Sequence, residues 1–265
     1  MAKNKKQPSL DYEMKLDQSI KLIQAWMGKE KLYLGFSGGA DSVILYHITT
    51  VAVGRENFDA VYCVSPIDPR PIHRFIRQEY PDVIWEYHAR GFWRTVERKG
   101  LPFRQRRWCC KIIKEAGGAG RIVLIGNRRD ESPRRNSQCF VENARGSKDK
   151  LLIRPILDFT DNDRWRYIRE NKLPYISLYD EGAKRERFGY GEGIFKRLGC
   201  VLCPFSRQIA REEEYFPEIV KLWRLVCNRI VANTKARGYK NLKGEDVKHK
   251  FETGEELYQW WTKRD

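Results

Sequence analysis

Residues Leu32–Tyr46 read LYLGFSGGADSVILY. The apolar run Leu32–Phe36 is typical of a buried strand, and the apolar run Val43–Tyr46 is typical of a helix. Between the two runs, the adjacent glycines Gly38 and Gly39 let the backbone approach a ligand closely. The stretch therefore predicts a strand, a tight turn and a helix whose first N–H groups face an anion.

The polar residues of this turn complete a predicted phosphate cradle. Serine hydroxyls can donate to phosphate oxygens, and Asp41 can cap the helix or orient a metal ion. The turn is not a Walker A loop, because no Gly-Lys-Ser/Thr follows at the required spacing. An ordinary capped turn is the alternative interpretation. The predicted nucleotide-binding residues are Ser37, Gly38, Gly39, Asp41 and Ser42.

Strand patterns alternate with helix patterns over the first two thirds of the chain, which predicts an α/β fold with a doubly wound, mainly parallel sheet. The expected strands are 32–36, 59–64, 83–87, 121–127 and 151–156. A helical pattern, interrupted at Pro217, follows over residues 207–237. We therefore expect an α/β domain with an N-terminal helix at 1–205, and a helical C-terminal extension packed on it at 206–265.

Composition and charge narrow the class of protein. The chain has 265 residues, of which 41% are hydrophobic, so a sizeable core is expected. No apolar run is long enough to span a bilayer and the N-terminus does not resemble a signal peptide, so we expect a cytoplasmic protein without a membrane partner. The net charge is +16, and residues 87–150 alone carry 17 Lys/Arg against 6 Asp/Glu. This excess favours a polyanionic partner, with nucleic acid first.

Two basic segments could contact such a partner or a nucleotide. Gly91–Arg107 interleaves arginines with Trp93 and Phe103, a pattern that suits base stacking if the rings are exposed. If the rings point inward, the segment is an ordinary surface helix. A second segment, Arg128–Arg135, follows a predicted buried strand and carries four arginines, whose guanidinium groups suit oxyanions.

Seven cysteines in a chain expected in a reducing compartment favour metal binding or redox chemistry over disulfides. Cys109 and Cys110 are adjacent, and Cys200 and Cys203 form a C-x-x-C followed by proline. Four thiolates suit a 4Fe–4S cluster or a zinc ion. The adjacent pair is unusual for zinc, whose paired cysteines are normally two to four residues apart.

SGGADS resembles the signature of the PP-loop ATP pyrophosphatases, and the order of motifs resembles the phosphoadenosine phosphosulfate (PAPS) reductase family in its iron–sulfur branch. The motifs are SGGADS, Cys109-Cys110, GNRRDESPRR, RPILDFTDNDRWRYI and GCVLCP, within about Lys31–Phe205. The resemblance implies an adenine nucleotide alpha hydrolase-like fold. It also implies that one 4Fe–4S cluster is ligated by Cys109, Cys110, Cys200 and Cys203. By the same resemblance, the anionic end of the nucleotide lies at Arg128, Arg129, Ser132 and Arg135.

The function implied is an ATP-dependent, iron–sulfur-containing sulfurtransferase. ATP with Mg²⁺ would bind the glycine-rich turn, an acceptor would be adenylated with release of pyrophosphate, and sulfur would displace AMP. The expected catalytic residues are Asp41, Arg128 and Arg129. By analogy with DNA phosphorothioation proteins and iron–sulfur tRNA thiolases, the expected acceptor is DNA or tRNA. A sulfur donor such as a cysteine desulfurase is an expected partner, and a homodimer is compatible with the resemblance.

Two departures from the reductases keep alternatives open. The C-terminal Glu-Cys-Gly-Ile/Leu-His segment, which carries their nucleophilic cysteine, is not found here, and Ser65–Asp68 stands where they usually have Asp-Thr-Gly. An APS or PAPS reductase would therefore need another nucleophile, for which Cys139 is the candidate. The remaining alternative is a non-catalytic subunit that binds nucleotide or nucleic acid.

Overall fold

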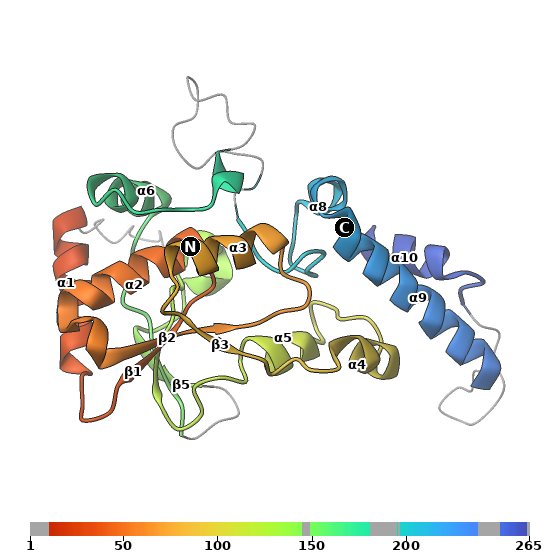
Figure 1. The fold of residues 1–265 in the computed structure, drawn as a ribbon, viewed down its shortest axis with the longest axis horizontal. Coiled ribbons are helices and arrows are strands. Elements are labelled where there is room, and N and C mark those ends of the chain that lie inside the picture. Colours follow the sequence, from red (N-terminus) through yellow and green to blue (C-terminus); the bar gives the residue numbers. More distant parts are fainter. Residues whose placement is uncertain (1–10, 145–148, 181–194, 196, 238–249, 264–265) are drawn as a thin grey trace, which may run out of the picture. The chain divides into compact units, whose positions relative to one another are not determined.

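The structure, a computed structural model, describes residues 11–144, 149–180, 195, 197–237 and 250–263. The chain divides into two units (Figure 1). The sheet unit comprises Met1–Cys63, Pro71–Glu86 and Gly117–Arg197. The helical unit comprises Val64–Arg70, Tyr87–Ala116 and Leu198–Asp265. The predicted boundary between residues 205 and 206 stays a prediction.

The sheet unit is built on six strands in the order β3-β2-β1-β4-β6-β5. These are β1 (Leu32–Gly35), β2 (Phe58–Cys63), β3 (Ile84–Glu86), β4 (Ile122–Leu124), β5 (Val141–Asn143) and β6 (Leu151–Ile153). Pairing is parallel except between β5 and β6, which are antiparallel. The predicted α/β fold with a mainly parallel sheet is confirmed. The edge strand β5 was not predicted, because three residues are too short to show an alternating pattern.

The described residues of the sheet unit contain the helices α1 (Tyr12–Ala25), α2 (Ala40–Val53), α3 (Arg70–Glu79) and α6 (Asp161–Glu170). Helix α2 packs on both α1 and α6. Its apolar residues Val43, Ile44 and Ile48 are completely buried, which explains why this segment is hydrophobic on most sides. The start of α2 is thus held firmly next to the end of β1.

The start of α6 is joined to α1 by a buried ion pair. The Lys15 ammonium lies 2.7 Å from the Asp163 carboxylate, and both side chains are largely buried. Asp163 also accepts from the backbone N–H of Thr160, whose hydroxyl accepts from the Asp163 N–H in return. Burial raises the pKa of Asp163, but the hydrogen bonds from Lys15 and Thr160 outweigh this and hold it below its ordinary value.

This pair makes the sheet unit sensitive to acid. Because the folded-state pKa of Asp163 is lowered, its contribution to stability is present above about pH 4 and lost as the pH falls through the lowered value. In urea unfolding at pH 7 and pH 3, we expect Asp163→Asn to be less stable than the wild type at pH 7. The difference should shrink at pH 3. An equal difference at both pH values would contradict the role assigned to this carboxylate.

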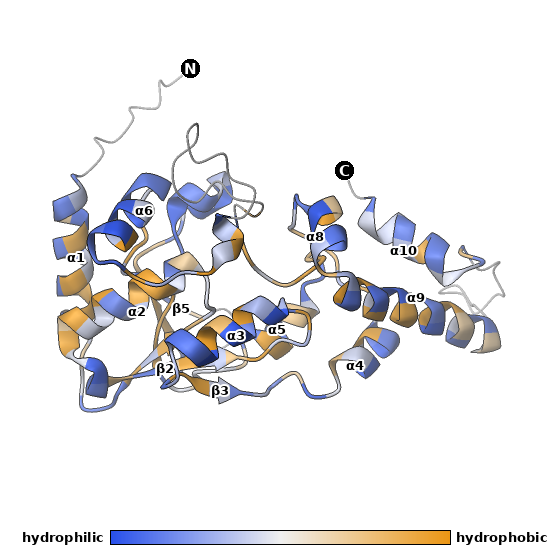
Figure 2. Ribbon diagram, turned by 45° about the horizontal axis from the view of Figure 1, so that its top comes forward, coloured by the Kyte–Doolittle hydropathy of each residue, from blue (hydrophilic) through white to orange (hydrophobic). Residues whose placement is uncertain are grey.

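The helical unit contains α4 (Phe92–Lys99), α5 (Trp108–Ile113), α8 (Ile209–Tyr215), α9 (Pro217–Arg237) and α10 (Gly254–Thr262). Polar and apolar residues alternate along α9, as Figure 2 shows. Its Trp223 is fully buried and stacks against Trp261 of α10, with ring centroids 4.6 Å apart. The predicted helical C-terminal region is confirmed, including the break before Pro217. No helix in the described ranges is long and apolar enough to cross a membrane.

The contact between α9 and α10 requires a glycine at position 254. A Cβ atom added to Gly254 would lie 2.4 Å from the backbone nitrogen and Cα of Asn228. Because backbone atoms cannot move aside locally, we expect Gly254→Ala to destabilise the protein by about 1–3 kcal/mol. Thermal unfolding measures this, with Gly28→Ala as the control, since a Cβ at Gly28 meets nothing within 4 Å. Equal melting temperatures for the two variants would refute the close approach.

Candidate functional site

The glycine-rich turn follows β1 directly and leads into α2. Gly38 adopts a φ of +71°, and a Cβ there would lie 3.1 Å from the side chains of Ile72 and Ile76 on α3. The Ser42 hydroxyl accepts from the backbone N–H of Ser37 at 3.1 Å and donates to the Gly39 carbonyl at 2.8 Å. Glycine is therefore required at position 38, and the serines fix the shape of the turn.

The first N–H groups of α2 are only partly used. Gly39 is the N-cap and provides no capping side chain. The Ala40 N–H donates to the Tyr179 hydroxyl at 3.3 Å. Within the part of the chain that the structure describes, the N–H groups of Gly38 and Asp41 have no acceptor. A 14-residue helix with open N–H groups at its start, at the carboxyl end of a parallel strand, can bind an anionic group such as phosphate.

Asp41 lies at the centre of a buried charge network. Its carboxylate accepts from Arg128 Nε at 2.6 Å and lies 3.6 Å from Arg164 Nη1. Both guanidinium groups also bind Asp161, at 2.8 and 3.1 Å. Burial alone would lower the pKa of Arg128, but the charges of Asp41 and Asp161 raise it. Since Arg128 is 2% exposed, this network suits it to hold the turn in place.

The other residues predicted at the anionic end of the nucleotide lie in two short turns after β4. Arg129 pairs with Asp158 and donates to the Gln138 carbonyl at 3.0 Å. Arg135 pairs with Glu131, which also binds Arg197, and Ser132 lies between the two turns. Burial is the main cause that lowers the pKa of Arg135; the charges of Arg197 and Arg128 lower it further, whereas those of Glu131 and Asp41 raise it. Three guanidinium groups are thus gathered here with two carboxylates, and this excess of positive charge favours an anion.

The four predicted cysteine ligands lie together in the helical unit. Cys109 and Cys110 are on α5, whereas Cys200 and Cys203 are in the turn before α8. All four line one small cavity, together with Ile67, Pro102, Ile113, Lys114, Leu202, Pro204 and Trp223. All seven cysteines of the chain are free thiols. The structure therefore brings two motifs that are about 90 residues apart in the sequence to one place.

The electrostatics of the cavity favour one thiolate, that of Cys110. The hydrogen bond with Cys110 raises the pKa of Cys109, and burial raises the pKa values of Cys200 and Cys203. The Cys109 thiol, together with Arg107, whose Nη2 donates to the Cys110 sulfur at 3.4 Å, lowers the pKa of Cys110 to about 6. The charge of Cys200 raises the pKa of Lys114 and keeps it an ammonium ion. Thiolates are the form that binds metals, and adjacent cations stabilise them.

The donor set fits an iron–sulfur cluster better than a single ion. Four sulfur ligands at about 2.3 Å from one tetrahedral zinc would lie about 3.8 Å from each other. Among the described residues, no three of these sulfurs lie within 4.8 Å of one another. In a cluster each cysteine binds a different iron, so wider spacing is expected. The residues present therefore fit a 4Fe–4S cluster, which Cys109, Cys110, Cys200 and Cys203 would hold.

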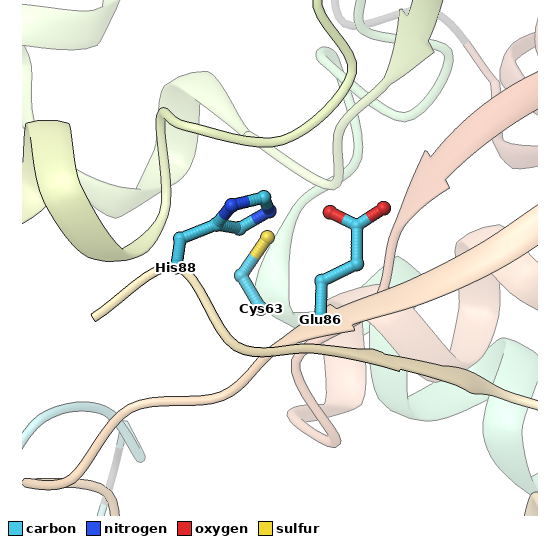
Figure 3. A group of neighbouring side chains, drawn as sticks. All are labelled: Cys63, Glu86 and His88. Carbon is cyan, nitrogen blue, oxygen red and sulfur yellow. The ribbon is translucent and has the colours of Figure 1, made fainter. Parts of the chain in front are cut away.

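A further thiol lies at the end of β2. Figure 3 shows Cys63 and Glu86, from the ends of neighbouring strands, pointing to the same side; the third labelled residue, His88, belongs to the helical unit. The Tyr33 hydroxyl donates to Glu86 at 3.1 Å and lies 3.5 Å from the Cys63 sulfur. Burial raises the pKa of Cys63, so this thiol stays neutral and belongs to the core of the sheet unit.

The sequence analysis did not single out Arg164 or Lys114. The position of each residue in its helical pattern could have indicated its role. Arg164 precedes Ile168 by one helical turn, so it lies on the buried side of α6 and needs a carboxylate partner. Lys114 follows Cys110 by four residues and lies at the end of α5, on the face of that cysteine.

Comparisons with known proteins identify the family of the chain. The sequence matches the profile of the phosphoadenosine phosphosulfate reductase domain over residues 31–206. It is 27% identical to MJ0973 of Methanocaldococcus jannaschii over 80% of this chain and 52% of that protein. It is 25% identical to the adenosine 5'-phosphosulfate reductase of Lysinibacillus sphaericus over 66% of this chain and 74% of that protein. The chain spans about half the length, or less, of the two archaeal relatives it matches. A solved structure, the phosphoadenylyl-sulfate reductase of Candida auris, is similar with a TM-score of 0.46, 14% identity, and coverage of 66% of this chain and 94% of that one.

Proposed function

Because the chain belongs to the phosphoadenosine phosphosulfate reductase domain family, we propose that it is an ATP-dependent, iron–sulfur-containing sulfurtransferase that adenylates an acceptor. The observation that carries this proposal is the turn Ser37–Ser42, where the N–H groups of Gly38 and Asp41 are open beside the positive charge around Arg135. Open backbone N–H groups and guanidinium groups are the donors that bind the oxygens of a polyphosphate. The net charge of +16 supports nucleic acid, DNA or tRNA, as the acceptor.

In the proposed reaction, an acceptor oxygen attacks the α-phosphorus of ATP, the bond to the β-phosphate oxygen breaks, and pyrophosphate leaves with the electron pair. Hydrosulfide from a donor then forms a bond to the activated atom, the bond to the AMP oxygen breaks, and AMP leaves. This displacement depends on positioning and charge neutralisation. The N–H groups of the turn bind phosphate oxygens, Arg135 offsets their charge, and Asp41 positions Arg128.

Two cofactors belong to the proposal. Asp41 is engaged by two arginines and is not a free carboxylate ligand, so Mg²⁺ would be held chiefly by the phosphates of ATP and by water. A 4Fe–4S cluster, when bound by the four cysteines, would supply either an iron that binds sulfide or a charge that stabilises the bound substrate. Three further points stay predictions: the roles of Arg129 and Ser132 in binding the anionic end of the nucleotide, a cysteine desulfurase as the sulfur donor, and a homodimer.

The test is pyrophosphate release from ATP by protein prepared without oxygen, alone and with tRNA or duplex DNA. Release that increases with one nucleic acid supports acceptor adenylation and identifies the polymer. No release under any condition, with ATP bound, would favour a non-catalytic subunit.

A reductase is the second candidate, favoured by the similarity to adenosine 5'-phosphosulfate reductases. Its assay is sulfite release from adenosine 5'-phosphosulfate with thioredoxin as the reductant. Exposed Cys139 is the candidate nucleophile. Sulfite release that disappears in Cys139→Ser, without pyrophosphate release from ATP, would replace the first proposal by this one.

A further inference from the structure

We propose that the exposed basic surface beside the cysteine cavity binds single-stranded nucleic acid, with the ring of Phe205 stacking on an unpaired base. This inference rests on the proposed function, for which it names the form of the acceptor. Nine cations lie between residues 90 and 114, against one carboxylate in the same range, Glu97. All nine are exposed: Arg90, Arg94, Arg98, Lys99, Arg104, Arg106, Arg107, Lys111 and Lys114. We call this set the basic surface.

Carboxylates offset only a small part of the basic surface: the charge of Asp68 acts on Lys114 and that of Glu115 on Arg107, where each raises the pKa of the cation. Among the described residues, none of its nine cations forms an ion pair with a carboxylate. Cations elsewhere in the helical unit do so: Arg224 pairs with Glu255, Arg229 with Glu97 and Lys235 with Glu252. Unpaired like charges repel one another, and a polyanion that binds them removes this cost.

A cluster in the cysteine cavity would account for only part of this charge. Arg107 contacts the Cys110 sulfur and Lys114 lines the cavity, so these two cations can balance thiolates. The other seven members of the basic surface have no contact with a cysteine sulfur among the described residues. Their charge therefore needs a different partner, and a phosphate backbone provides regularly spaced negative charges.

The basic surface contacts the segment that follows Cys203, where an aromatic ring is exposed. Arg104 donates to the Pro204 carbonyl at 2.8 Å. The next residue, Phe205, is 43% exposed, and the Arg107 guanidinium lies 5.0 Å from its ring centroid. The rings expected from the sequence to stack on bases are half-buried against other rings: Trp93 packs against Trp223, and Phe103 packs against Trp260.

An exposed ring among arginines is the arrangement that holds unpaired bases, since stacking needs a base face that a duplex does not offer. A base on Phe205 would be bound two residues after Cys203, in the segment whose Cys203 and Pro204 line the cysteine cavity. The acceptor is therefore single-stranded where it is bound, either as a strand or as a loop.

The test is fluorescence anisotropy without ATP, using a labelled 12-nucleotide oligouridylate, an oligothymidylate of equal length and a 12-base-pair DNA duplex. We expect both single strands to bind more tightly than the duplex. Phe205→Ala should weaken single-strand binding about 5- to 150-fold, since stacking of one base is worth about 1–3 kcal/mol. Arg106→Gln/Lys111→Gln should make the dependence of log K on log salt shallower by about 1.4.

The matched control is Arg224→Gln/Lys235→Gln, which removes the same two charges from exposed, ion-paired positions. We expect it to leave the salt dependence unchanged. Iron content and melting temperature identify variants that have lost their fold. Equal losses in both double variants, or tighter binding of the duplex, would overturn the proposal. Pyrophosphate release measured on the same preparations separates the two proposals: release without single-strand binding leaves adenylation intact and rejects this surface.

Discussion

Asp41→Asn is expected to lower pyrophosphate release from ATP by about 100-fold or more. The substitution keeps the shape of the side chain but removes the charge that Arg128 and Arg164 share. Both guanidinium groups are 3% exposed, so they would face each other without their central counter-ion. Loss of one preorganised electrostatic group in an active site typically costs 10²–10³-fold in rate. Breaking a buried pair also destabilises by about 3–5 kcal/mol.

The control for this prediction is Asp161→Asn. Asp161 binds the same two arginines, but its side chain is 64% exposed. Water can replace an exposed carboxylate, so we expect a loss of less than about 10-fold in rate and about 1 kcal/mol in stability. Rates are measured well below the melting temperature of each variant, so that unfolding does not mimic lost catalysis. Equal rates for Asp41→Asn and the wild type would remove Asp41 from the site.

Cys200→Ser and Cys109→Ser are each expected to lose most of the iron and acid-labile sulfide that the wild type retains after purification without oxygen. The wild type should hold about four irons per chain, because a 4Fe–4S cluster uses four cysteine ligands. Each substitution removes one ligand from the cavity that all four cysteines line. A hydroxyl is a poor replacement for a thiolate at iron, so the cluster should be lost.

Cys139→Ser is the control, because Cys139 is exposed and belongs to the sheet unit, outside the cavity. We expect it to keep its iron. Iron and sulfide analysis and visible absorption give the readout. About one zinc per chain in the wild type, with no sulfide, would show a mononuclear site instead of a cluster.

The order of the strands and helices could be predicted from the sequence because each of the longer elements carries its own periodicity. Residues 32–46 contain the apolar strand, the glycines and the start of α2 within 15 positions, so local chemistry alone indicates an anion-binding turn. The four cysteines could also be chosen from their spacing and the family resemblance. The strand β5 could not, because a three-residue edge strand exists only through its pairing with β6.

Three features were decided by the tertiary structure. Asp41 lies between Arg128 and Arg164, which are 87 and 123 positions further along the chain, so no local pattern pairs them. How far an aromatic ring is exposed depends on what packs against it: Trp93 is half-buried against Trp223, whereas Phe205 stays exposed. The charge pattern of residues 90–114 is plain in the sequence, but only folding shows that none of its cations forms an ion pair with a carboxylate of the described part of the chain. Sequence determines which groups are available, and packing determines which of them remain free to bind, because burial and pairing depend on residues far apart in the chain.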